Sequence, residues 1–214
     1  MSTRYAAAMV LALLILMGAA DGRVRGGHFP SEGMVKHVLD GDTIVLETGE
    51  NVRYLGIDAP ELRHDGKPSE CWARKAQNAN SEMVLGKRVE LRFSPQTRDR
   101  FGRLLAYVFT SDGTCVNVEM VRSGNAWIYG ARENPEMFSE LLTAQKSALD
   151  LRRGLWKACY VKPEKVYHGN RDSSVFHRPR CPLGREMSER SKVPFTTRRE
   201  AFAEGFSPCR NCRP

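Results

Sequence analysis

The chain has 214 residues, of which 41% are hydrophobic and 27% charged, and its formal net charge is +8. This composition supplies enough apolar side chains for a well-formed core and excludes a globally disordered protein. The positive charge favours a polyanionic partner, because a basic surface attracts phosphates and speeds their encounter. Charge alone does not distinguish an enzyme from a passive binder.

Residues 1–20 have the composition of a cleavable secretory signal. Arg4 supplies a positive charge, an apolar run extends from Tyr5 to Met17, and small residues precede Asp21. The alternative is an uncleaved membrane anchor, but the run is shorter than the roughly 18 to 20 apolar residues that a membrane-spanning helix needs. We therefore expect a secreted or periplasmic protein without stable membrane association after cleavage.

The region from Gly33 to Phe109 alternates short β-branched and aromatic runs with turns, which is typical of strands. Five strands are expected, at Met34–Val38, Thr43–Glu47, Val52–Ile57, Arg88–Phe93 and Leu104–Phe109. Tight connections are expected at residues 40–42 and 48–51. Five such strands suit a small closed barrel.

Helical patterns lie between and after these strands. Three helices are expected, at Ser69–Leu85, Val116–Arg122 and Pro135–Leu151. The first is expected to end at Gly86, and the third has Asn134 as its N-cap and a proline in its first turn. The third also has an apolar stripe that would pack on the barrel. The predicted fold class is α+β, mainly β.

The composition changes after Trp156. Residues 161–174 are polar and contain Pro163, Gly169 and Asn170, which predicts a linker. The last segment, 175–214, is too short to bury a core of its own without a metal ion or disulfide bonds. The sequence therefore predicts a first domain at 31–160 and a small module at 175–214.

Two short acidic motifs in the first domain offer oxygen ligands. Asp40 and Asp42 belong to the first motif, and Asp58 and Glu61 to the second. Hard cations such as calcium prefer several oxygen ligands at about 2.3 to 2.6 Å. Taken alone, each motif is better explained by a turn or a strand end than by metal binding.

Read together with Val52–Ile57 and Asp99–Tyr107, these motifs resemble the staphylococcal nuclease family. The shared pattern is an acidic pair at a strand turn, an Arg five residues before an Asp, a Pro-Glu just after it, and a distant Gly-Arg that opens another strand. The resemblance covers roughly Gly33 to Cys159. It implies a five-stranded Greek-key barrel of the oligonucleotide-binding kind, the OB-fold, with packed helices.

The resemblance implies a calcium site. Asp42 and Asp58 would supply its carboxylates and Ala59 a main-chain carbonyl, with Asp40 close by. Calcium would stabilise charge as a Lewis acid and orient the attacking water.

The resemblance makes Glu61 the general base and Arg53 and Arg103 the phosphate-binding catalytic arginines. Water must lose a proton as it attacks phosphorus, and the negative charge that accumulates on the phosphoryl oxygens suits planar guanidiniums. Strict strand alternation would place Arg53 opposite Asp58, so we expect a bulge or bend at Gly56. The implied activity is calcium-dependent endonucleolytic hydrolysis of DNA and RNA that leaves 3′-phosphates.

Arg100, Phe101 and Tyr129 are expected to bind the substrate, the aromatic rings by stacking on a base and Arg100 through phosphate. Core packing is the alternative for the two aromatic residues. The family prototype has Lys and Tyr where this chain has Arg100 and Phe101, which leaves base preference open.

The six cysteines fall into two groups of three. Some exported relatives look similar around Cys71 and Cys159, and this likeness implies a disulfide that would stabilise the fold by roughly 4 kcal/mol. Cys115 would then be a small buried side chain.

The second group belongs to the C-terminal module, where His177, Cys181, Cys209 and Cys212 form a His-x-x-x-Cys and a Cys-x-x-Cys pair. Four such ligands suit tetrahedral zinc, and a disulfide among the cysteines is the alternative. The segment resembles the zinc-binding domain of the Ada DNA-repair protein, including Phe-x-Arg-Pro and residues 201–206. Its first ligand there is a methyl-accepting cysteine, so His177 implies a structural zinc site without repair chemistry.

The module is also basic, which predicts weak DNA affinity; its arginines are Arg178, Arg180, Arg185, Arg190, Arg210 and Arg213. A second hypothesis is a non-catalytic nucleic-acid-binding module, because related barrels keep the fold without activity. The presence of Arg53, Glu61 and Arg103 argues against it. A third, a methyl-damage sensor, is disfavoured by His177. We expect a monomer that acts on DNA and RNA.

Overall fold

The computed structural model describes residues 29–63, 66, 68–130 and 135–214. The predicted signal at 1–20 and the predicted N-cap Asn134 lie outside the described residues. Among the helices that are described, none has the length and apolar character that crossing a membrane requires.

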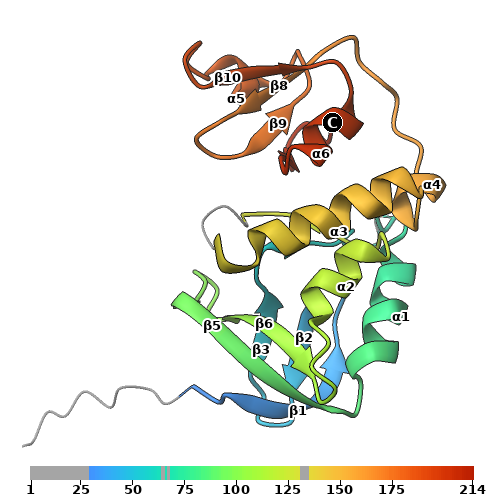
Figure 1. Cartoon of the computed structure of the whole chain (residues 1–214), viewed down its shortest axis with the longest axis vertical. Helices are drawn as coiled ribbons and strands as arrows, with labels where there is room; N and C mark the ends of the chain where they lie inside the picture. Colours follow the sequence, from blue (N-terminus) through green and yellow to red (C-terminus); the bar gives the residue numbers. More distant parts are fainter. Residues whose placement is uncertain (1–28, 64–65, 67, 131–134) are drawn as a thin grey trace, which may run out of the picture.

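A closed five-stranded barrel forms the N-terminal domain (Figure 1). Its strands are β1 (Glu32–Val38), β2 (Thr43–Leu46), β3 (Asn51–Tyr54), β5 (Arg88–Arg98) and β6 (Leu104–Thr110). They follow the order β1-β2-β3-β6-β5, and only the β3–β6 pairing is parallel. The barrel with a few helices confirms the predicted fold class.

Helices pack beside the barrel (Figure 1). They are α1 (Ala73–Val84), α2 (Val116–Arg122), α3 (Phe138–Asp150) and the short α4 (Leu155–Ala158). The first begins later than predicted, and the third is preceded by a 3-10 turn, η2 (Pro135–Met137). The buried Asn117 fixes α2 to the barrel, because its side chain accepts from Val108 N at 2.9 Å and donates to Leu55 O at 2.9 Å.

The predicted strand Val52–Ile57 is divided in two. Strand β3 ends at Tyr54, and after a turn β4 (Ile57–Asp58) pairs with β7 (Trp127–Ile128) instead of with the barrel. The expected irregularity at Gly56 is present, since this residue has φ +74°, a conformation that glycine adopts readily. The turn redirects the chain toward β7.

The C-terminal module contains a four-stranded sheet in the order β10-β8-β9-β11. Its elements are β8 (Tyr167–Asn170), β9 (Val175–His177), α5 (Pro182–Arg185), β10 (Lys192–Phe195), α6 (Arg198–Ala203) and β11 (Ser207–Pro208). Strand β8 falls inside the predicted linker at 161–174. Gly169, interpreted there as a loop residue, is packed under two aromatic rings: a Cβ at this position would lie 2.6 Å from Phe195 and 2.8 Å from Phe206.

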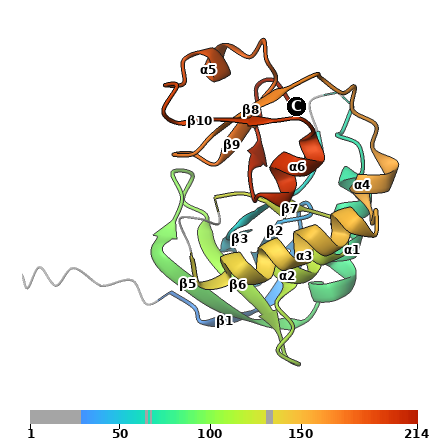
Figure 2. The same ribbon diagram turned by 45° about the horizontal axis from the view of Figure 1, so that its top comes forward.

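The module is docked on α3 and β7 (Figure 2). Leu149 of α3 belongs to the same apolar cluster as Phe176, Phe202 and other module residues. The buried Gln145 joins the two parts, because it accepts from Ile128 N at 2.8 Å and donates to Phe202 O at 2.6 Å. Ser207 adds a hydrogen bond of 2.9 Å to the carbonyl of Ile128. Buried apolar and polar contacts together hold the module against the N-terminal domain.

A disulfide joins Cys71, just before α1, to Cys159, just after α4, with an S–S distance of 2.06 Å across 88 residues of sequence. Cys115 is free and half-buried. It packs against the barrel core.

The double variant Cys71→Ser/Cys159→Ser should lose about 4 kcal/mol of unfolding free energy, because opening so long a loop restores entropy to the unfolded chain. Denaturant titration under oxidising conditions measures this loss, and the single variant Cys115→Ser is the control. A double variant as stable as the control would contradict the expectation.

Candidate active site and metal centre

One buried arginine lies between two buried carboxylates. Arg53 on β3 places Nε 3.1 Å from Asp42 Oδ1 and Nη2 2.7 Å from Asp58 Oδ1. Its Nη1 donates to the carbonyls of Tyr54 and Ile57, both at 2.8 Å. The turn at Gly56 makes this arrangement possible, since it returns Asp58 to the face on which Arg53 lies. The guanidinium of Arg53 therefore contacts both carboxylates and both carbonyls of the turn.

Burial makes the two carboxylates costly to ionise. It raises the pKa of Asp42 to about 6, although the charge of Arg53 opposes the shift. Burial also raises the pKa of Asp58, again against Arg53. For Arg53, burial alone would lower the pKa, but the charges of Asp42 and Asp58 raise it. The three carboxylates of Asp40, Asp42 and Asp58 still outnumber the two guanidiniums that oppose them, those of Arg53 and Arg210, which favours an additional cation.

The oxygens predicted to bind calcium come from adjacent groups. Ala59 N donates to Asp42 Oδ2 at 2.6 Å, which places the main chain at Ala59 beside the Asp42 carboxylate. Asp40 Oδ1 accepts from Asp42 N at 2.9 Å and closes the preceding turn. The neighbouring buried carboxylates of Asp42 and Asp58 are hard donors of the kind that suits calcium. These carboxylates therefore fit this ion.

Glu61 lies at the surface beside these carboxylates. Partial desolvation raises its pKa, and the negative charges of Asp42 and Asp58 raise it further. The position of Glu61 is fixed by Glu70, whose Oε2 lies 3.1 Å from Glu61 N and whose own N lies 3.0 Å from Glu61 O. A carboxylate with a raised pKa that is accessible to water suits proton acceptance.

Arg103 and Arg53 both line an open cleft of about 350 Å³, the main cleft, together with Ser94, Tyr129 and Arg210. Arg103 lies just before β6, where Asp99 Oδ2 accepts from Arg103 Nε at 2.7 Å. Asp99 Oδ1 also accepts from Arg103 N at 3.0 Å, so the carboxylate orders the turn that presents the guanidinium. Two guanidiniums on one cleft can hold a phosphate between them.

The predicted substrate-binding aromatics are at the surface and not in the core. Phe101 is 70% exposed, and Tyr129 is 36% exposed and lines the main cleft. Arg100 stacks on Phe101, with its guanidinium 4.8 Å from the ring centre. Core packing, the alternative for both rings, is therefore wrong.

Arg210 was not predicted to reach this site. It belongs to the C-terminal module, yet its Nη2 lies 2.6 Å from Asp58 Oδ1 and its guanidinium lies 4.7 Å from the centre of the Tyr129 ring. Nothing local in the sequence distinguishes Arg210 from the other basic residues of the module, because the contact depends on how the module docks.

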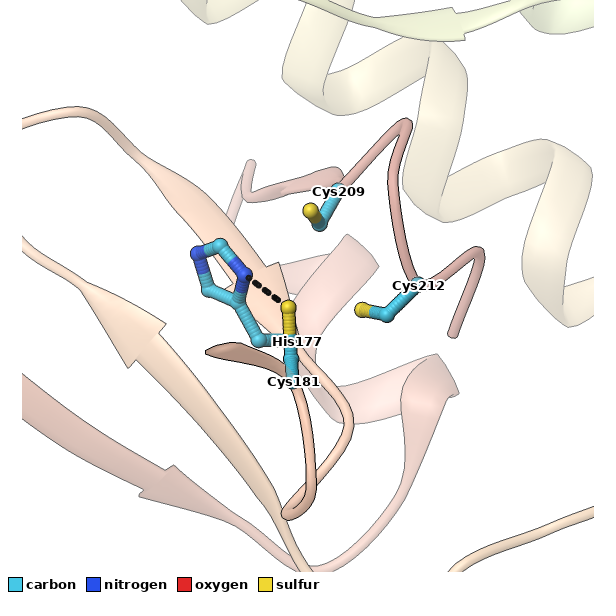
Figure 3. Close-up of side chains that lie close together, drawn as sticks. All are labelled: His177, Cys181, Cys209 and Cys212. Carbon is cyan, nitrogen blue, oxygen red and sulfur yellow. Dashed lines mark hydrogen bonds between the residues drawn. The ribbon is translucent and has the colours of Figure 1, made fainter. Parts of the chain in front are cut away.

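The module also contains a cluster of four metal-ligand side chains (Figure 3). The ligand atoms of His177, Cys181, Cys209 and Cys212 all lie within 4.8 Å of one another. Parallel pairing of β9 with β11 brings His177 beside Cys209, whose N donates to Phe176 O at 3.0 Å. One histidine and three cysteines form a tetrahedral zinc donor set.

Close packing and buried thiols both fit a metal in this cluster. A Cβ on Gly184 would approach the Cβ of His177 to 2.9 Å, so glycine allows α5 to lie against the ligand. Burial raises the pKa of the Cys212 thiol to about 12, and a bound cation would favour the thiolate form that binds metal. No disulfide joins these three cysteines, which are free in the structure.

Comparison with known proteins assigns the first domain. Residues 51–158, half of the chain, match the family described as Staphylococcal nuclease homologue. The chain belongs to the staphylococcal nuclease family. Residues 162–214 match the metal binding domain of Ada, so this match begins within the segment predicted to be a linker. The predicted resemblance to both families is confirmed.

Individual relatives cover the staphylococcal nuclease domain. An uncharacterized endonuclease of Escherichia coli O157:H7 is 37% identical over 138 residues, which cover 63% of this chain and 83% of that protein. The thermonuclease of Staphylococcus intermedius is 31% identical over 127 residues, 58% of this chain and 75% of that protein. The thermonuclease of Staphylococcus hyicus is 28% identical over 160 residues, which cover 69% of this chain and 94% of that protein.

Removing the buried arginine of the staphylococcal nuclease domain should test the charge balance of the site. In chelator, Arg53→Ala should lower the unfolding free energy by about 3 kcal/mol, because Asp42 then remains buried without its counter-charge and Asp58 keeps only Arg210. Added calcium should restore part of the loss by supplying positive charge. Thermal and denaturant unfolding with and without calcium measure both effects.

The matched control for this variant is Arg88→Ala, which removes an exposed ion pair with Glu32 and should change stability by less than about 1 kcal/mol. Equal losses in the two variants would mean that the buried cluster does not depend on Arg53.

The C-terminal cluster should bind about one zinc ion per chain. Cys181→Ser and Cys209→Ser should each lower the zinc content and the melting temperature, because structural zinc contributes folding free energy. Elemental analysis and thermal unfolding measure the two quantities, with Cys115→Ser as the control. Zinc-free protein that retained a folded module would contradict the assignment.

Proposed function

We propose that this protein is an exported, calcium-dependent endonuclease that hydrolyses phosphodiester bonds in DNA and RNA and leaves 3′-phosphates. The observation that carries the proposal is the meeting of Arg53 and Arg103 on one cleft beside the buried Asp42 and Asp58. Membership of a nuclease family and the endonucleases and thermonucleases among its relatives support the reaction class.

Each side chain of the site has a separate role in the reaction. Glu61 accepts the proton of the attacking water, and its raised pKa makes it a stronger base than an ordinary glutamate. Arg103 and Arg53 bind the phosphoryl oxygens as negative charge accumulates on them. Calcium, bound by Asp42, Asp58 and the Ala59 carbonyl, would supply Lewis-acid stabilisation and orient the water.

Surface residues beside the main cleft orient the substrate. Tyr129 offers a ring on which a base can stack, and Phe101 offers a second on the neighbouring turn. Arg100 adds positive charge for the sugar-phosphate backbone. Stacking does not depend on base identity, so this arrangement suits hydrolysis of nucleic acids of many sequences.

Export to an oxidising compartment, secreted or periplasmic, is supported by the signal-like segment 1–20 and by the Cys71–Cys159 disulfide. Zinc at His177, Cys181 and the Cys209–Cys212 pair stabilises the module structurally. The protein acts as a monomer on its nucleic acid substrates.

The proposal is tested by digesting DNA and RNA with the full chain, in calcium and in chelator, beside Glu61→Gln. Cleavage should require calcium, and the variant should lose at least about 100-fold in rate, because general-base catalysis contributes on the order of 10² to 10⁴. Removal of product phosphates by a 3′-phosphatase identifies the ends.

Glu47→Gln is the matched control, since it removes an equivalent exposed carboxylate in the barrel domain away from the cleft. Near-normal cleavage by Glu61→Gln would mean that another group is the base. Binding of nucleic acid without cleavage, in any divalent metal, would favour the non-catalytic binding module.

A further inference from the structure

We propose that Arg210 of the C-terminal module binds a phosphate of the nucleic acid in the main cleft, so that the zinc-binding module forms part of the nuclease's substrate-binding site. The inference rests on the proposed function and extends it. It assigns to the module a role in substrate binding at the reacting site, in addition to its structural role.

Arg210 stands where three clefts meet. It lines the main cleft with Arg53 and Arg103, and it lines a second cleft beside Asp58 and Glu61. It also lines a third cleft of about 470 Å³, the module cleft, which is bordered by Asn170, Val175, His177, Asn211 and Tyr129. A strand leaving the main cleft over Tyr129 would therefore pass Arg210 as it enters the module cleft.

The main chain of Arg210 is held firmly while its side chain is accessible. Arg210 lies between the metal ligands Cys209 and Cys212, and Arg213 N donates to Cys209 O at 2.9 Å, closing this turn. The side chain of Arg210 is 59% exposed, whereas that of its partner Asp58 is 5% exposed. Zinc would therefore fix the base of the side chain and leave the guanidinium free to turn toward the cleft.

The ion-pair partner of Arg210 should change when a divalent cation and the substrate bind. In the structure Arg210 neutralises Asp58, the carboxylate predicted to bind calcium. A divalent cation at that carboxylate would replace the guanidinium and repel it. The anion that then comes within reach is a substrate phosphate in the main cleft, for which a guanidinium is the matching fork. Arg210 would exchange Asp58 for phosphate as metal and substrate bind.

The docking of the module is specific enough for this role. Gln145 and Ser207 tie it to the barrel domain through hydrogen bonds, and Arg213 lies 3.1 Å from Glu70. Arg210 is thus delivered to the cleft by a fixed surface and not by a flexible tail, which favours a defined contact over general electrostatic attraction.

The test measures binding without cleavage. Full-length Glu61→Gln protein, loaded with zinc and calcium, is titrated with a short fluorescent oligothymidylate at a series of salt concentrations. The same titration is made with Arg210→Ala and Arg190→Ala added to this background. Arg190 is the matched control, because it is an exposed arginine of the same module that does not line these clefts.

Arg210→Ala should weaken binding roughly ten-fold. It should also reduce the slope of log affinity against log salt by about 0.7, the value for one phosphate contact on a single strand. Arg190→Ala should change both quantities less, and Arg210→Lys should restore the slope more fully than the affinity, because lysine keeps the charge and loses the fork. Zinc content and melting temperature are compared among the variants, so that a misfolded module is recognised.

An unchanged affinity and slope in Arg210→Ala would overturn the inference. So would tighter binding of both oligonucleotide and calcium, since Arg210 would then act only as a competitor of the metal. Absence of cleavage by the wild-type chain would defeat the proposed function, yet the salt-dependence comparison would still decide whether Arg210 contacts phosphate.

Discussion

The guanidinium of Arg53 is the interaction on which the rest of the site depends. It holds together two buried like charges, Asp42 and Asp58, that would otherwise repel each other, and it also binds both carbonyls of the turn between β3 and β4. One side chain therefore fixes the strand end, the turn and the carboxylates. Because the same group lines the main cleft, the stability of the local fold and the chemistry of the site cannot be varied independently.

Two chemically different sets of candidate metal ligands are organised in this chain. The first contains the buried carboxylates of Asp42 and Asp58, which suit a hard cation, and the second contains three sulfurs and an imidazole, which suit zinc. This difference in ligand softness would direct a hard cation to the first set and zinc to the second. The two sets are nevertheless linked in space, since the residue after Cys209 reaches the carboxylate of Asp58.

Sequence reasoning recovered the parts of the fold that depend on local patterns. Alternating apolar residues and turn residues located the barrel strands, and the order of the acidic and arginine motifs indicated the family. It placed β3 and β4 in one strand, although Gly56 marked the irregularity between them. It also interpreted Gly169 as a linker residue. The packing of Gly169 under Phe195 is a tertiary contact, which the local sequence pattern does not reveal. Arg210 could not be found, since its partner is 152 residues away in sequence.

The packing of helix α3 constrains how this two-domain arrangement could have evolved. Its Leu141 and Ala144 belong to the barrel core, whereas its Leu149 belongs to the core of the C-terminal module, and Gln145 bonds to both parts. The boundary between the two matched families lies near residue 160 in the sequence, but in packing it runs along this one helix. A lineage that gained or lost the second segment would have needed compensating substitutions on α3, because a helix suited to two cores exposes apolar and unpaired polar groups when one of them is removed.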